Sequence, residues 1–220
     1  MVLRQAATSR EQRGFGVTVV LHDGGQIEKR LPVAMTFAQE MVTAPENPSA
    51  VENIPVEAWE MTLDVNLKGV FLCNRAVIPY FKQQRRGKII NVASIGGRRG
   101  GTGLPAYSAS KAGVINLTQS IALQVAPFNI NANTICPGLV WTSMWAEGIS
   151  FTTGKERWGK LQAQGVTPEE AFNRMVQAGT PLKRPQTPED MGHLAVFLAS
   201  DLAREITGQA INVDGGVVLS

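Results

Sequence analysis

The chain has 220 residues, of which 44% are hydrophobic, and a formal net charge of +3 at pH 7. This length and composition fit one globular domain that buries roughly 70% of the surface of its unfolded chain. The charge is mild and shows no basic stripe with interleaved aromatic residues, and no apolar run reaches the roughly 18 residues of a membrane span. We therefore expect neither a nucleic-acid partner nor a membrane.

The first 50 residues differ in character from the remainder. Residues 15–21 form a candidate strand, ended by a turn at residues 22–25, and residues 34–42 form a candidate short helix. The segment TAPENPSAVENIP that follows is a predicted loop. We expect an atypical segment over residues 1–50, with one strand and one helix, and a single α/β unit over residues 51–220.

The middle of the chain alternates long helical patterns with apolar runs. From Val56, apolar residues recur at steps of three, four or seven, which predicts a long helix that breaks at Arg86 and Gly87. The run at residues 88–93 predicts a buried parallel strand that leads to Ser94. A second long helix is predicted from residue 107 to about residue 125.

The last third continues this alternation. Residues 129–136 predict a strand that is stopped by Pro137 and Gly138, and residues 142–181 contain helical patterns. A helix over residues 188–200 follows Thr187, a candidate N-cap, and residues 209–213 form the last predicted strand. Strands that alternate with helices in this way predict an α/β fold with a parallel sheet.

Three side chains of this region suit proton transfer. Tyr107 and Lys111 are four residues apart, so on a helix they share one face, and an ammonium beside a phenol favours the phenolate. Ser94 lies at the carboxyl end of a predicted strand, where open α/β sheets bind their ligands. We predict a site that exchanges a proton with a substrate oxygen.

Four sequence blocks carry a resemblance to a known family. They are DVNLKGVF, NVASIGG, YSASK, and NTICPGLVWTSMW followed by ITGQAINVDGG. In this order and spacing they resemble the short-chain dehydrogenase/reductase (SDR) family, from about residue 50 to the C-terminus. The resemblance implies a Rossmann-like doubly wound parallel sheet, with residues 51–220 as its catalytic part.

The N-terminal cofactor motif of the family has no counterpart in this sequence. The family opens with a strand and a Thr-Gly-x-x-x-Gly-x-Gly turn, whose backbone amides hold a pyrophosphate. The nearest stretch, residues 8–16, places Ser9 and Arg13 where small residues are needed. We expect the fold to be incomplete at its N-terminal half, and we hypothesise that residues 1–50 reflect a truncation, an alternative start or a frameshifted reading.

A sheet without its first strands leaves the predicted strand at residues 88–93 with an exposed apolar edge. Such an edge is an aggregation hazard, so something must cover it. Either residues 1–50 supply a strand, with residues 15–21 as the candidate, or another subunit does.

The resemblance assigns roles to four candidate catalytic residues. Tyr107 would be the general acid/base, and Lys111 would lower its pKa and bind the nicotinamide ribose. Ser94 would hydrogen-bond the substrate oxygen, and Asn66 would hold a water that links Lys111 to solvent. For Asn66 the alternative is a residue that caps a local kink of its helix.

The resemblance also implies a cofactor, NAD or NADP. Besides Tyr107 and Lys111, its binding residues would be Pro137 and Gly138, where the chain passes the nicotinamide, Val140, whose backbone binds the carboxamide, and Thr142. For Thr142 a plain helix N-cap is the alternative.

Other side chains near the predicted site have two interpretations each. Trp141, Met144 and Trp145 either line an apolar substrate pocket or pack under a lid. Arg98 and Arg99 either receive an acidic group or lie in a solvated loop. Asp214 more simply fixes the final turn, and the basic run at residues 84–88 is interpreted as a solvated helix exit.

Two functions follow from the sequence. The first is an NAD(P)-dependent oxidoreductase that interconverts a small secondary alcohol and a ketone; the second is an inactive binding module with an incomplete dinucleotide site. Family members pair through two long helices, here about residues 56–85 and 107–125, so we expect a homo-oligomer. Cys73 and Cys136 are predicted free thiols of a reducing, cytoplasmic compartment, and no Cys, His or carboxylate group has the spacing of a metal site.

Overall fold

The computed structural model describes residues 17–21, 33–38, 51–100, 105–142, 145 and 155–219. The predicted turn at residues 22–25, the stretch at residues 8–16 and Met144 lie outside the described residues. The strands are β1 (Val17–Leu21), β2 (Val33–Ala38), β3 (Gly87–Val92), β4 (Ile130–Pro137) and β5 (Ala210–Val213). The helices are α1 (Val56–Leu63), α2 (Gly69–Gln84), α3 (Pro105–Val125), α5 (Lys155–Ala163), α6 (Pro168–Gly179) and α7 (Pro188–Ala199).

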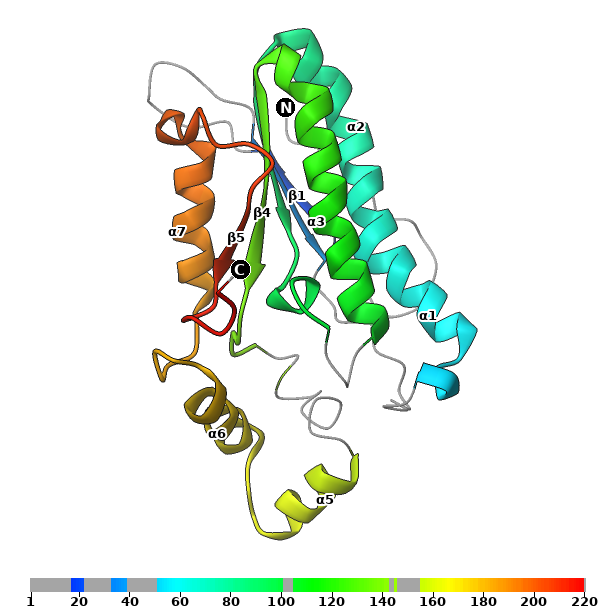
Figure 1. Ribbon diagram of the computed structural model, residues 1–220, viewed down its shortest axis with the longest axis vertical. Helices are drawn as coiled ribbons and strands as arrows, with labels where there is room; N and C mark the ends of the chain where they lie inside the picture. Colours follow the sequence, from blue (N-terminus) through cyan, green and yellow to red (C-terminus); the bar gives the residue numbers. More distant parts are fainter. Residues whose placement is uncertain are drawn as a thin grey trace.

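The strands form one sheet with the order β1-β2-β3-β4-β5 (Figure 1). Strands β2 to β5 are parallel, and β1 runs antiparallel to β2. The long helices α2 and α3 cover one face of the sheet and α7 covers the other (Figure 1). The predicted α/β fold with a doubly wound parallel sheet is confirmed.

The N-terminal segment covers the exposed edge of β3, but with a strand that the sequence pattern did not predict. Residues 34–42 were expected to be helical, and this prediction is wrong over residues 34–38, which belong to β2; residues 39–42 lie outside the described residues. Strand β2 pairs in parallel with β3, from Val33 opposite Lys88 to Thr36 opposite Asn91. The free hydrogen-bonding edge of β3 selects the extended form of this short apolar run, whose periodicity fits either structure. The predicted strand at residues 15–21 is present as β1, one place further out.

Alternate residues of β3 fill the two cores. Ile89 packs with Val77 and Phe81 of α2 and with Ile121 and Val125 of α3. Its neighbour Ile90 points to the other face, into a cluster with α7. Successive side chains of a strand point to opposite faces, so a strand buried on both sides has a continuous apolar sequence.

The long helix predicted from Val56 is confirmed but is not uniform. A π-helical turn at Asp64–Lys68 separates α1 from α2 and contains Asn66 at its centre. The helix then runs through Pro79 to Gln84 and ends at Arg85, which has the left-handed φ of 49°. π-Helical turns inside α-helices are rare and occur often at functional sites.

Hydrogen bonds between buried polar side chains fix α2 against α3. Asn66 Nδ2 donates to Ser110 Oγ at 3.2 Å, while two turns further on Asn74 Nδ2 donates to Asn91 Oδ1 at 3.0 Å. Asn91 Nδ2 in turn donates to Thr118 Oγ1 at 2.9 Å. Each of these hydrogen bonds forms only when the two helices are in one relative position along their axes. Together they therefore fix the position of Asn66 relative to α3.

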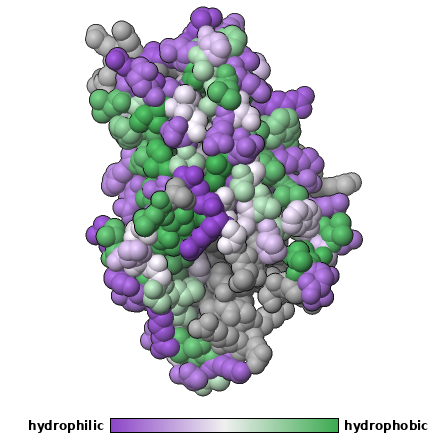
Figure 2. Space-filling view, viewed as in Figure 1, coloured by the Kyte–Doolittle hydropathy of each residue, from purple (hydrophilic) through white to green (hydrophobic). Residues whose placement is uncertain are grey.

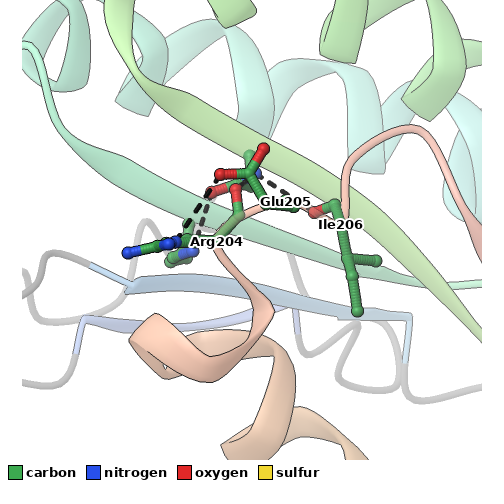
Figure 3. A network of polar contacts seen from close by, with 5 residues as sticks. Arg204, Glu205 and Ile206 are labelled. Carbon is green, nitrogen blue, oxygen red and sulfur yellow. Dashed lines mark hydrogen bonds and ion pairs between the residues drawn. The ribbon is translucent and has the colours of Figure 1, made fainter.

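A polar network closes the sheet at the amino ends of β3 and β4. Asn131 Nδ2 donates to the carbonyl oxygens of Arg204 and Ile206, next to an Arg204–Glu205 ion pair at 3.6 Å (Figure 3). Asn131 Oδ1 accepts from Lys88 Nζ at 2.7 Å. Lys88 is buried, and burial lowers its pKa, so the predicted solvated exit at residues 84–88 is wrong for this residue.

Candidate functional site

Ser94 is held at the carboxyl end of β3 by a short turn. It is the N-cap of the 3-10 turn Ile95–Gly97, and its Oγ accepts a hydrogen bond from Gly96 N at 3.0 Å. A side-chain hydrogen bond joins Ser94 to Tyr107 of α3. A methyl group on Gly96 would lie 3.2 Å from Tyr107 Cε1 and 3.4 Å from Ser94 Oγ. The two hydroxyl groups therefore share one small space.

Lys111 lies one turn after Tyr107 on the same face of α3. Its Nζ is 5.6 Å from the centroid of the Tyr107 ring, and the residue is buried. Burial lowers the pKa of Lys111 from 10.5 to about 8, because the ammonium loses hydration. The structure thus brings the predicted hydroxyl, phenol and amine together.

The predicted direction of the Tyr107 pKa is wrong in this structure. Burial raises the pKa of the phenol, and its hydrogen bond with Ser94 acts in the opposite direction. The loss of hydration penalises the phenolate. Lys111 lies over the face of the ring, and burial lowers its pKa as well. In this state Tyr107 is a protonated donor at neutral pH.

Asn66 lies behind this group and is fully buried. Its Nδ2 donates to Ser110 Oγ, and Ser110 Oγ donates to the backbone oxygen of Tyr107 at 2.7 Å. Its Oδ1 is buried and has no hydrogen-bond partner among the described residues. A buried acceptor of this kind is normally satisfied, often by water. The water that the resemblance assigns to Asn66 fits this oxygen, and the alternative, a local helix distortion, is present as well.

Pro137 ends β4, and the loop after it contains Gly138, Val140 and Thr142, three further residues predicted to bind the cofactor. Gly138 N donates to Val213 O at 3.0 Å, and a Cβ on Gly138 would lie 2.5 Å from Gln186 Oε1. The glycine is therefore required by close packing within the protein itself. Val140 forms a parallel bridge with Gln186. Thr142 Oγ1 is buried without a partner among the described residues, which leaves it available to a ligand.

The two described tryptophans of the predicted pocket pack against α6. The rings of Trp141 and Trp145 each lie 5.1 Å from the ring of Phe172, a fully buried residue of α6. Leu139 and Val176 extend the same cluster. This arrangement supports the packing interpretation over the substrate-pocket interpretation.

Asp214 has the structural role that was expected. Its Oδ1 accepts from Gly216 N at 2.9 Å, and its Oδ2 accepts from Val218 N at 2.8 Å. These bonds hold the chain turn that follows β5.

Two residues near the site have roles that sequence patterns did not indicate. Gln186 is buried against Gly138, and no motif marks it. Of the two interpretations of Arg98, the solvated loop is wrong, because its Nε donates to Asn212 Oδ1 at 3.1 Å and its guanidinium also reaches the backbone oxygen of Ala210. The exposed Arg99 fits the predicted loop.

Both cysteines are free thiols, Cys136 buried and Cys73 partly so. Within the described ranges, no three His, Cys, Asp or Glu residues gather in a group able to hold a metal ion. Within the same ranges, no helix has the length and apolar character needed to cross a bilayer.

Two family models match the chain. Residues 42–151 match the family model described as short chain dehydrogenase, and residues 159–218 match the model described as Enoyl-(Acyl carrier protein) reductase. The first match includes all four predicted catalytic residues.

Curated relatives include enzymes from several bacteria. The chain is 36% identical over 166 residues to D-beta-hydroxybutyrate dehydrogenase of Rhizobium meliloti, which covers 76% of this chain and 61% of the relative. It is 39% identical over 163 residues to 3-oxoacyl-(acyl-carrier-protein) reductase FabG of Thermotoga maritima, covering 74% and 58%. The chain thus spans about three fifths of the length of the curated relatives it matches.

Solved structures share the fold. A 3-oxoacyl-(acyl-carrier protein) reductase from Brucella melitensis matches with a TM-score of 0.68 and 26% identity, covering 86% of this chain and 63% of that one. Levodione reductase matches with a TM-score of 0.69 and 28% identity, covering 80% and 63%. Across residues 42–218, the chain belongs to the short-chain dehydrogenase/reductase family.

Proposed function

We propose that the protein is an oxidoreductase that interconverts a small secondary alcohol and a ketone with NAD or NADP. One observation carries this proposal: Ser94, Tyr107 and Lys111 converge at the carboxyl end of the sheet, in a chain of this family. One relative, the D-beta-hydroxybutyrate dehydrogenase of Rhizobium meliloti, has the name of an alcohol-oxidising enzyme, which supports the substrate class.

In the proposed reaction, Tyr107 donates a proton to the ketone oxygen or removes one from the alcohol. Ser94 donates a hydrogen bond to the same oxygen and stabilises the charge that develops on it. Lys111, with a pKa of about 8, exchanges a proton near neutral pH, and the unpaired Asn66 Oδ1 holds the water through which that proton leaves. NAD(P), when bound, supplies or accepts the hydride.

The described residues fit one half of this cofactor. Thr142 offers an unpaired buried hydroxyl in the loop after β4, and Lys111 is free of any carboxylate partner among the described residues. The pyrophosphate half is different, because β1 and β2 are antiparallel and so form no βαβ unit with a helix N-terminus at the phosphates. Among the residues that the structure describes, there are groups that fit the nicotinamide half, and none that would hold the pyrophosphate.

That half-built cofactor site favours a second candidate function. Without a pyrophosphate cradle the same fold would be an inactive binding module, with Ser94, Tyr107 and Lys111 inherited from an enzyme. The free thiols suit a reducing compartment, and we propose the cytoplasm for both functions.

Titration with NADH and NADPH separates the two functions. Trp141 directly precedes Thr142, so we expect tryptophan fluorescence to change saturably at up to millimolar cofactor if the enzyme is intact. Thr142→Val, which removes the hydroxyl at nearly the same volume, should weaken binding about tenfold. Absence of any response to either cofactor would favour the inactive module.

We further propose that two copies pair through the long helices. Within one chain, a groove of about 460 Å³ lies between these helices. The apolar residues that line it are Leu63, Leu67, Phe71, Gly113 and Leu117. Phe71 is 45% exposed, a large fraction for a phenylalanine. On the face shown in Figure 2, hydrophobic residues stand in groups between hydrophilic ones.

Phe71→Asp should therefore shift the protein from oligomer to monomer, because each of two symmetric contacts would bury a charge. Size-exclusion chromatography with light scattering measures the mass. Val196→Asp, on the exposed side of α7, is the matched control for the α2–α3 face and should leave the mass unchanged. A mass that responds only to the control would place the interface on α7 instead.

A further inference from the structure

We propose that Arg98 is a positioning residue, which anchors the Ile95–Gly97 turn to β5 and thereby holds the Ser94 hydroxyl beside Tyr107. This inference rests on the proposed function for its catalytic meaning, but the anchor itself can be tested without turnover.

The anchor spans three strands. Arg98 follows β3, and its guanidinium passes over β4 to reach β5, where it donates to Asn212 Oδ1 and to Ala210 O. It also forms a hydrogen bond with the thiol of Cys136 on β4. Cys136 is paired with Asn212 in the sheet, so all three contacts lie at one place.

The turn between Ser94 and Arg98 connects the contacts of Arg98 to the position of Ser94. Arg98 N donates to Ile95 O at 3.0 Å, and Gly97 N donates to Ser94 O at 3.0 Å. On the opposite side the turn rests directly on α3, where a Cβ on Gly97 would lie 2.6 Å from the backbone carbon of Lys111. The turn is thus held between the Tyr107–Lys111 helix and the last strand.

The contacts of Arg98 indicate that it holds neighbouring segments in place and does not form an ion pair. Among the described residues no carboxylate pairs with Arg98, and the two oxygens to which it donates, Asn212 Oδ1 and Ala210 O, are neutral acceptors. A planar guanidinium with several fixed donors is suited to joining such acceptors in one geometry. Asn212 extends the connection, since its Nδ2 donates to Val218 O at 3.0 Å beyond the Asp214 turn.

Alkylation of Cys136 reports whether the anchor holds. Cys136 is fully buried under this turn, whereas Cys73 on α2 is partly exposed and serves as the internal reference. In native protein treated with N-ethylmaleimide, Arg98→Met should raise the rate at Cys136 about tenfold relative to Cys73, measured by mass spectrometry. Arg98 lowers the pKa of Cys136, so its loss alone would slow the reaction, and a faster rate reports access.

Two further variants complete the test. Arg99→Met, at the exposed neighbour, should leave both rates unchanged, and Arg98→Lys, which keeps the charge but loses the fork of donors, should give an intermediate rate. If Arg98→Met does not fold, a rise of about threefold in Arg98→Lys is the expected result. An unchanged Cys136 rate in a folded Arg98 variant would overturn the anchor.

Where turnover is measured, Arg98→Met should lower kcat about tenfold with little change in the KM for the dinucleotide, because Ser94 and not the cofactor is displaced. Arg98→Lys should recover part of kcat. Faster alkylation with an unchanged kcat would overturn the positioning role while leaving the anchor standing. Failure of the proposed function itself would appear separately, as absence of turnover in the unaltered protein.

Discussion

Tyr107→Phe should lower kcat by about a thousandfold while leaving the fold intact. The phenol is the acidic group placed against Ser94, and general acid–base groups contribute roughly 10²–10⁴ to rates. Phenylalanine fills the same space, so the Gly96 contact with the ring is kept. The measurement is cofactor-dependent reduction of a ketone panel, followed through NADH or NADPH absorbance.

The chain offers a matched control for this substitution. Tyr80 is 59% exposed on α2, far from the site, so Tyr80→Phe should change neither kcat nor the free energy of unfolding. The Tyr107→Phe variant should also retain the fluorescence response to cofactor. A variant that keeps full turnover would contradict the role of Tyr107 as acid/base.

Lys111→Met should stabilise the protein at pH 7 and lose this advantage at high pH. Burial lowers the pKa of Lys111 from 10.5 to about 8, which corresponds to about 3 kcal/mol of unfolding free energy. Between these values the unfolded chain holds a proton that the folded chain has lost, so the free energy of unfolding of the unaltered protein rises with pH. Methionine carries no proton and removes this rise.

Other buried groups also change the free energy of unfolding with pH, so the unaltered protein must be compared with the Lys111→Met variant. Burial raises the pKa of Cys136 from 9.0 to about 11, so the folded chain keeps a thiol proton that the unfolded chain loses. That contribution lowers stability between these values and offsets Lys111 above about pH 9. Lys111 is the smallest contributor to the Cys136 shift, so this contribution is nearly the same in both proteins and largely cancels in their difference.

Urea unfolding from pH 7 to pH 10.5 measures this difference. The advantage of Lys111→Met should shrink by about 3 kcal/mol across the range. Lys68→Met, at an exposed lysine 3.1 Å from Asp64, should show no such trend. A difference that stays constant with pH would mean that Lys111 keeps an ordinary pKa in the folded protein.

Much of the fold was accessible from local patterns. The helices after Val56, Tyr107 and Thr187 and the strand before Pro137 are long and periodic, so they were predicted within a few residues. Strand β2 was not, because VAMTFA is short and apolar and only its pairing with β3 decides its structure. Local propensity yielded there to a tertiary contact.

The residues of the candidate site also fall into those that local sequence could predict and those that it could not. Ser94, Tyr107 and Lys111 were predicted from their positions on recognisable elements, and Asn66 was predicted from the family resemblance. Arg98 and Gln186 were not, since their partners lie more than 100 and about 48 residues away in sequence, in contacts that only the folded sheet creates. The pKa of Tyr107 was predicted in the wrong direction because spacing gives the neighbour but not the burial.

The anchoring of Ser94 by β5 has a consequence for synthesis on the ribosome. A nascent chain that has emerged only as far as α7 already contains Ser94, Tyr107 and Lys111, yet it lacks Asn212 and Ala210, which hold the turn. Domains generally fold as units once their last elements emerge. Proton-transfer competence should therefore arise only after β5 has emerged from the ribosome and joined the sheet.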